Sequence, residues 1–172
     1  MLITSHVLAG TLIGLAAPNA PTAVAVGVVS HIAMDSLPHW GNAEGEDYLR
    51  VARVDGVVGL AVSAGVLLAT PPDHRLRVAA GIFGACLPDT DQIADHFLGR
   101  TFHPAWFDRI HAGVQFEHDY LISDVLVIGA LASVVTRRLR HVARQRSDPG
   151  VVAGRHQGSA GPLQGWSHEQ PR

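Results

Sequence analysis

The chain alternates between long apolar stretches and short polar segments, most of which contain proline. The apolar stretches carry almost no charge, and a proline disfavours helical backbone at the residue before it. Five helical segments are therefore expected, over residues 2–17, 22–37, 54–70, 78–87 and 120–136. They are apolar on all faces, which is unusual for the surface helices of a soluble bundle. The pattern predicts an all-α fold whose helices are buried in protein or in lipid.

Segment length and the spacing of small residues help to decide whether protein or lipid surrounds these helices. Each segment is shorter than the roughly 20 residues of a comfortable transmembrane helix, so a soluble all-α bundle remains an alternative. Small residues recur four positions apart in three of the segments, as lipid-embedded helices prefer. These pairs are Gly10/Gly14, Ala61/Gly65 and Ala80/Gly84. We predict a polytopic membrane bundle of about five short transmembrane helices over residues 1–136.

Charge is distributed unevenly along the chain. Of the 172 residues, 16% are charged and 47% are hydrophobic, and all thirteen basic residues are arginines. Residues 1–136 contain six arginines and thirteen acidic residues, a net charge of −7, which argues against a nucleic-acid partner. Residues 137–172 have a net charge of +5 and should form a basic, Gly/Ser/Gln-rich disordered tail. The positive-inside rule places this C-terminus in the cytoplasm and predicts a multi-pass protein of the bacterial cytoplasmic (inner) membrane.

This topology brings most of the candidate ligands to one membrane face. They share a position at the outer end of an apolar segment or in the connection just beyond it. They are His6, His31, Asp35, His39, Asp55, Asp89, Asp91, His103, His111, His118 and Asp119. The convergence holds whichever face is called outer, and it is the strongest functional signal in the sequence.

Two local patterns among these residues suit metal binding. The i,i+4 spacing of His31 and Asp35 places both on one helix face, with Cβ atoms about 5–6 Å apart. Asp89 and Asp91 are two positions apart in a segment expected to be extended, and both can reach one centre from a turn. Each pattern has a structural alternative. The first can be a hydrogen-bonded core pair, and the second a helix stop followed by the N-cap of the next helix.

The crowding of acidic residues favours a cation. Four acidic residues would lie together in one partly desolvated site at the membrane face, and they are Asp35, Asp55, Asp89 and Asp91. Like charges in such a site must become protonated or bind a cation. Imidazole with carboxylate suits Zn²⁺, Mn²⁺ or Fe²⁺, and the single Cys86 excludes a multi-cysteine zinc motif. We predict a divalent metal ion, Zn²⁺ first with Mn²⁺ or Fe²⁺ as alternatives, that activates a water.

Each candidate is given a role. The predicted metal ligands are His6, His31, Asp35, Asp89 and Asp91. Asp55 and His111 are the predicted catalytic residues, which complete the site or act as general base. His6 can equally be a packed polar residue, and His103 and His118 rank below His111. Asp124 is either a buried hydrogen-bond acceptor or a group that orients a ligand.

Several of these residues form blocks that resemble a group of small bacterial membrane proteins. The blocks are a His-containing first helix, His-x-x-x-Asp-x-x-Pro-His-Trp at 31–40, Asp55 at the start of the next helix, and Leu-Pro-Asp-x-Asp at 87–91. More distantly, the chain is similar to predicted inner-membrane metal-dependent hydrolases and to zinc-dependent phospholipase C. Those hydrolases also have His-Arg-Gly and Thr-His-Ser signatures, to which the nearest counterpart here is 109–113. The resemblance covers roughly residues 1–135 and implies a metal-dependent hydrolase of the membrane.

The residues and the resemblance together predict one function and leave two alternatives. The predicted function is a membrane-embedded metal-dependent hydrolase of a phospholipid or another lipid-linked ester, with membrane lipids and a lipid-like substrate as partners. The first alternative is a non-catalytic cation-binding or transport protein, although transporters usually place ionisable groups near the membrane midplane. The second is a structural membrane protein whose polar residues only join helix ends.

Overall fold

The protein is mostly helical in a computed structural model that describes residues 1–41, 45–118 and 121–147. These ranges contain seven α-helices, one 3-10 helix and two short strands. The α-helices are α1 (Ile3–Ala16), α2 (Ala20–Asp35), α3 (Gly45–Ala69), α4 (Pro72–Cys86), α5 (Thr90–Leu98), α6 (Ala105–Val114) and α7 (Leu121–Ser147). The other elements are β1 (His39–Trp40), η1 (Leu87–Asp89) and β2 (Glu117–His118). The expected helical fold is confirmed.

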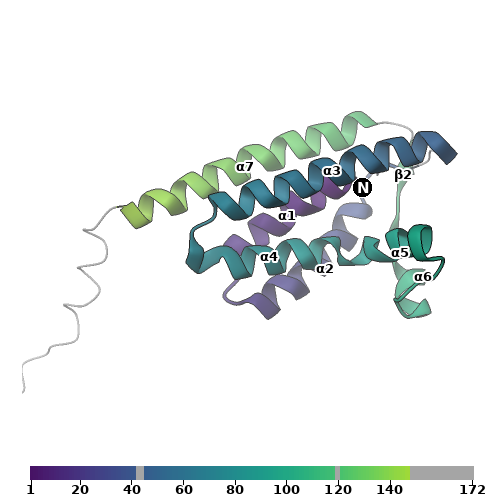
Figure 1. Ribbon diagram of the computed structural model, residues 1–172, viewed down its shortest axis with the longest axis horizontal. Coiled ribbons are helices and arrows are strands. Elements are labelled where there is room, and N and C mark those ends of the chain that lie inside the picture. Colours follow the sequence, from purple (N-terminus) through teal and green to yellow (C-terminus); the bar gives the residue numbers. More distant parts are fainter. Residues whose placement is uncertain (42–44, 119–120, 148–172) are drawn as a thin grey trace, which may run out of the picture.

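Helix α1 lies at the centre of the bundle. It packs against α2, α3, α4 and α7, and Figure 1 shows it running among them. Its surroundings explain why its sequence is apolar on all faces, because a helix with neighbours on several sides has little surface left for water. A core cluster of buried apolar side chains comes from α1, α3, α4 and α7, and its members are Leu8, Val66, Val78 and Val135.

Glycines allow α4 to approach α1 and α2 at backbone distance. A Cβ atom added at Gly10 would lie 2.5 Å from the carbonyl oxygen of Gly81, and one added at Gly84 would lie 2.3 Å from that of Val24. Such contacts exclude any larger residue and are typical of small-residue packing between apolar helices. Gly65 has no such neighbour within 4 Å, so the small-residue spacing expected at Ala61/Gly65 does not mark a contact inside the chain.

Three helices are longer than the apolar pattern indicates, and one of them is α4, which begins at Pro72 rather than near residue 78. Helix α3 begins at Gly45 rather than near residue 54, and α7 continues through the arginines to Ser147. The expectation of disorder from residue 137 onward is therefore wrong for 137–147, because arginine is a good helix former and Leu139 packs on the core. Residues 148–172 lie outside the described part of the chain.

The structure yields a limited membrane signal. Within the described ranges, α3 is the one helix that is long and apolar enough to cross a membrane, while α1 and α2 are apolar but shorter. The five transmembrane helices expected from the sequence therefore stay a prediction.

A small helical cap covers one end of the bundle. The connection expected over residues 89–119 contains α5 and α6, which lie at the opposite end from the turn between α3 and α4 (Figure 1). The parallel pairing of β1 with β2 and the hydrogen bond from Phe116 N to Asp35 O, at 3.0 Å, fasten the C-terminal side of α6 to the end of α2. The cap is thereby held over the helix ends that carry the candidate ligands.

Candidate metal centre

Four of the candidate ligands meet under the cap. His31 and Asp35 come from α2, Asp89 from the end of η1, and His111 from α6. One ligand atom of each lies within 4.8 Å of those of the other three. We call these four residues the inner group. Three of them were predicted from the sequence as metal ligands, and His111 was predicted as a catalytic residue.

The distances within the inner group suit one metal ion. Nε2 of His31 lies 3.0 Å from Oδ2 of Asp35 and 3.0 Å from Nε2 of His111. Oδ1 of Asp89 lies 3.4 Å from His31 Nε2 and 3.6 Å from His111 Nε2. Ligand atoms about 2.1 Å from a tetrahedral ion are about 3.4 Å apart. A small shift of the side chains would therefore accommodate the ion.

A backbone hydrogen bond orients the ring of His31. Its Nδ1 donates to the carbonyl oxygen of Ala85 at 2.6 Å, which leaves Nε2 as the ring atom that can bind a metal. This arrangement is common around metal-binding histidines. The contact depends on glycine packing, because Gly27, one helical turn before His31, lies against the backbone of Gly84 and Ala85.

The electrostatics of the inner group favour a cation. Two imidazole Nε2 atoms and two carboxylates lie within 4.8 Å of one another. A proton can join only two of these atoms, whereas a divalent ion can bind all four once both Nε2 atoms are deprotonated. Burial opposes the ionisation of Asp89, but the hydrogen bond and the charge of His31 hold the pKa of its carboxyl below its usual range. Asp89 is therefore ionised at neutral pH, the state in which a carboxylate could bind a cation.

His6 lies beside the inner group. Its ring stacks on that of His31 with centroids 4.0 Å apart, and its Nε2 is 3.2 Å from Oδ1 of Asp35. The side chain is fully buried, yet neither ring nitrogen forms a hydrogen bond with the residues that the structure describes. Buried polar atoms without partners are costly, so Nδ1, which also lacks a carboxylate contact among these residues, fits a ligand or substrate contact. The predicted role of His6 as a metal ligand stays a prediction.

Asp91 does not join the inner group. The segment expected to be extended forms η1 and the first turn of α5, and residues two apart on a helix point about 200° apart. Asp89 consequently faces the inner group, while Asp91 lies with His103 and Asp108. The backbone N–H groups of Phe102 and His103 donate to the Asp91 carboxylate. Burial raises the pKa of the Asp91 carboxyl, but these two hydrogen bonds outweigh burial and hold the pKa below its usual range.

Asp55 and Asp124 hold the N-terminus of α1. Asp55 accepts hydrogen bonds from the backbone of Ile3 and Thr4 and from the Thr4 hydroxyl. Asp124, which the sequence left open, accepts from the backbone N–H groups of Leu2 and Trp40. Carboxylates at this position satisfy free N–H groups and favour the helix dipole. The structure does not bring Asp55 into the inner group, and its predicted catalytic role stays a prediction.

The remaining predicted histidines have other contacts. His39 is buried, and its Nδ1 donates to the carbonyl oxygen of Leu37 at 2.8 Å. His118 lies in β2, edge-on to the ring of Phe116. Neither belongs to the inner group, and Asp119 lies outside the described part of the chain.

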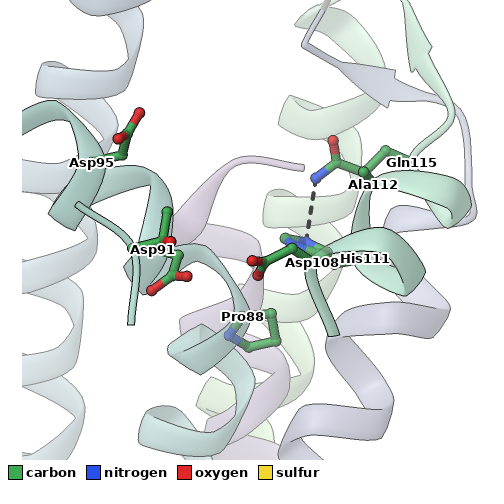
Figure 2. A pocket seen from close by; sticks show the side chains of 8 residues that line it. Pro88, Asp91, Asp95, Asp108, His111, Ala112 and Gln115 are labelled. Atoms are coloured by element: carbon green, nitrogen blue, oxygen red, sulfur yellow. Dashed lines mark hydrogen bonds between the residues drawn. The ribbon is translucent and has the colours of Figure 1, made fainter. Parts of the chain in front are cut away.

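A cavity of about 270 Å³ leads to the inner group. His111 is the member of the group that lines it, and Gln115 lies 3.2 Å from His111 Nε2 (Figure 2). The other lining residues come from η1, α5, α6 and the loop between the two helices, and they are Pro88, Asp91, Asp95, Thr101, Asp108 and Ala112. Three carboxylates therefore face a small space next to a predicted catalytic histidine.

Comparisons of the chain with protein families, curated proteins and solved structures find no match.

Proposed function

We propose that the protein is a membrane-embedded metal-dependent hydrolase of a phospholipid or another lipid-linked ester. The inner group would hold the divalent ion, Zn²⁺ first, with Mn²⁺ or Fe²⁺ as alternatives. One observation carries this proposal. Ligand atoms from α2, η1 and α6 converge at the end of an apolar bundle, and a cavity reaches them at His111.

The outward faces of the helices support the membrane part of the proposal. Helix α3, with 25 residues, is about 37 Å long, enough for a hydrocarbon core of about 30 Å. Only 17% of its most apolar stretch is buried in the protein, whereas the apolar core helix of a soluble protein would be covered. Leu60 and Leu68 on α3 are 74% and 78% exposed, and Leu76 on α4 is 73% exposed. Exposed apolar surface of this kind marks a membrane or protein contact, and lipid is the contact that fits a helix of this length.

The chemistry follows from the donor set. A divalent ion on imidazole and carboxylate ligands makes a water more acidic and polarises a phosphoryl or acyl oxygen. In the hydrolysis of a phosphodiester, the water oxygen bonds to phosphorus and the bond from phosphorus to the lipid alcohol breaks. One water proton ends on that alcohol, and the other remains with the phosphate product or the solvent. The chain's own residues position the reaction, because packing and hydrogen bonds fix the ring of His31.

The place and size of the cavity favour a lipid head group as the part that enters. At about 270 Å³, the cavity is at the small end of ligand pockets, so acyl chains would remain outside. The exposed apolar residues of α3 and α4 belong to the bundle whose end carries the cavity. A substrate that stays in the bilayer could therefore present its head group at the helix ends. Membrane lipids would therefore be both the solvent and the source of substrate.

The test measures metal content and lipid cleavage together. The full chain is purified in detergent, its metals are determined by elemental analysis, and cleavage of mixed phospholipids is followed by release of water-soluble phosphate esters. Asp89→Asn should lose both metal and cleavage. Asp73→Asn, at the other end of α4, is the matched control and should keep both.

Two results would contradict the proposal. Full metal content and full cleavage in Asp89→Asn would show that the inner group is not the site. Metal binding without cleavage, together with cation flux in proteoliposomes, would replace the hydrolase with a transporter that uses the same ligands.

A further inference from the structure

A second set of mixed ligands lies at the cavity that His111 lines. It consists of Asp91 on α5, His103 in the loop, and Asp108 on α6, and we call it the outer group. Nδ1 of His103 is 3.6 Å from Oδ2 of Asp91 and 3.7 Å from Oδ1 of Asp108. These separations are too long for hydrogen bonds but close to the spacing of about 3.4 Å around a tetrahedral ion.

The tautomer of His103 is set by Thr90. The Thr90 hydroxyl donates its one proton to the carbonyl oxygen of Leu87 at 2.6 Å, so it must accept at the contact of 3.2 Å with His103 Nε2. His103 therefore carries a proton on Nε2, and in the neutral ring the lone pair is on Nδ1. That Nδ1 is buried and has no hydrogen-bond partner in the part of the chain that the structure describes. A lone pair and two carboxylates thus face one point.

We propose that the outer group binds a second divalent cation, and that the two cations hold a phosphate ester between them in the shared cavity. The proposal rests on the proposed function and deepens it, because it selects phosphate esters over carboxylic esters. Three protein ligands leave a coordination position free for substrate, as in catalytic rather than structural zinc sites. A pair of cations can bind both the attacking and the leaving oxygen of a phosphoryl group.

The fold makes the two groups neighbours. The η1–α5 segment supplies Asp89 to the inner group and Asp91 to the outer one, while α6 supplies His111 to the inner group and Asp108 to the outer one. Residues three apart on a helix, such as Asp108 and His111, have Cβ atoms about 5–6 Å apart. Both of these residues line the same cavity (Figure 2).

The charge of the cavity also calls for this second cation. Asp91, Asp95 and Asp108 all line it, and the two carboxylates of the inner group already balance one divalent ion. A phosphate ester would then enter a cavity lined by three negative charges, which repels it. A divalent ion on the outer group offsets two of these charges and offers a direct ligand to the phosphate.

The experiment counts metal ions in the purified full chain. Titration with Zn²⁺ and elemental analysis should give two equivalents in the wild type and one in Asp108→Asn or His103→Gln. Asp95→Asn lines the same cavity outside both groups and should keep two. With Mn²⁺, electron paramagnetic resonance should show magnetic coupling between two ions in the wild type, and an uncoupled ion in Asp108→Asn.

The outcomes separate this proposal from the proposed function. One equivalent in the wild type that Asp35→Asn removes, with no effect of Asp108→Asn or His103→Gln, would overturn the second cation and leave the hydrolase standing. No metal in the wild type would overturn both, and the outer group would then be an ion pair between His103 and its two carboxylates. Circular dichroism of each variant shows whether the loss of an equivalent comes from misfolding.

Discussion

The inner and outer groups combine the same kinds of ligand but are held in different ways. Two ligands of the inner group lie on α2, which packs on α4 through direct backbone contacts. The outer group is built from the two short helices of the cap and the loop between them. The Asp35 side chain is fully buried, whereas that of Asp108 is 40% exposed.

This difference leads to different expectations for the two groups. A ligand side chain that packing holds in place, and whose other polar atom is hydrogen-bonded, binds metal more tightly than one that must become ordered on binding. We therefore expect the inner group to retain its ion through purification. The outer group should exchange its ion with the medium and follow the cation concentration supplied.

The largest effect is expected from Asp35→Asn. Oδ2 of Asp35 contacts both histidines of the inner group, and the amide lacks the charge that offsets the cation. Metal affinity at the inner group should fall by about 100-fold or more, and lipid cleavage should be lost. Zn²⁺ titration checks this, and the outer equivalent should remain. Loss of both equivalents would show that the two groups are not independent.

A change at Asp55 tests the support of α1 apart from the metal. Asp55→Ala leaves the N–H groups of Ile3 and Thr4 without their acceptor, which should cost about 1–3 kcal/mol for each buried donor. Thermal unfolding in detergent should show a lower midpoint, while both metal equivalents remain. If the midpoint is unchanged and kcat alone collapses, the predicted catalytic role is the correct one and the positioning role is not.

Gly84→Ala tests whether the packing of α2 on α4 affects metal binding at the inner group and not at the outer group. The added Cβ would lie 2.3 Å from the Val24 carbonyl oxygen and would push α2 away from α4, with His31 moving from Ala85. We expect destabilisation of about 1–3 kcal/mol, measured by thermal unfolding, and weaker Zn²⁺ binding at the inner group. Gly65→Ala is the matched control, since it meets open space. Equal effects of the two substitutions would contradict the packing argument.

The smallest effect is expected from Thr90→Val. Valine keeps the shape of threonine but removes the acceptor for His103 Nε2, so the outer ion should bind about tenfold more weakly. The inner equivalent should not change. An identical Mn²⁺ titration curve for wild type and variant would show that Thr90 does not orient His103.

Much of the helical scaffold could be predicted from local patterns. The prolines at residues 18, 21, 38, 71 and 88 lie at helix ends close to those expected, because the restriction that proline imposes acts on its own neighbours. Pro72 begins α4 earlier than expected. His31 and Asp35 meet because they lie one helical turn apart. The small residues at 10 and 14 mark a true helix contact.

Other features depend on contacts between distant segments. The two strands pair residues far apart in the chain, and α5 and α6 occupy a region read as a connection. The length of α7 depends on packing of Leu139 against the core. No local pattern joins Asp91, His103 and Asp108, because they come from α5, the loop after it and α6, and only the packing of the cap brings them together.

The sequence by itself determined the apolar helices of the scaffold and which of their ends carry imidazole and carboxylate groups. Only the tertiary structure decided which of these groups share a centre. It placed Asp89 and Asp91 in different groups, brought His111 into contact with His31, and placed Asp55 at the start of α1. The physical reason is one of range. Backbone propensity acts within about one turn, whereas the direction of a side chain relative to a distant donor depends on how whole helices pack.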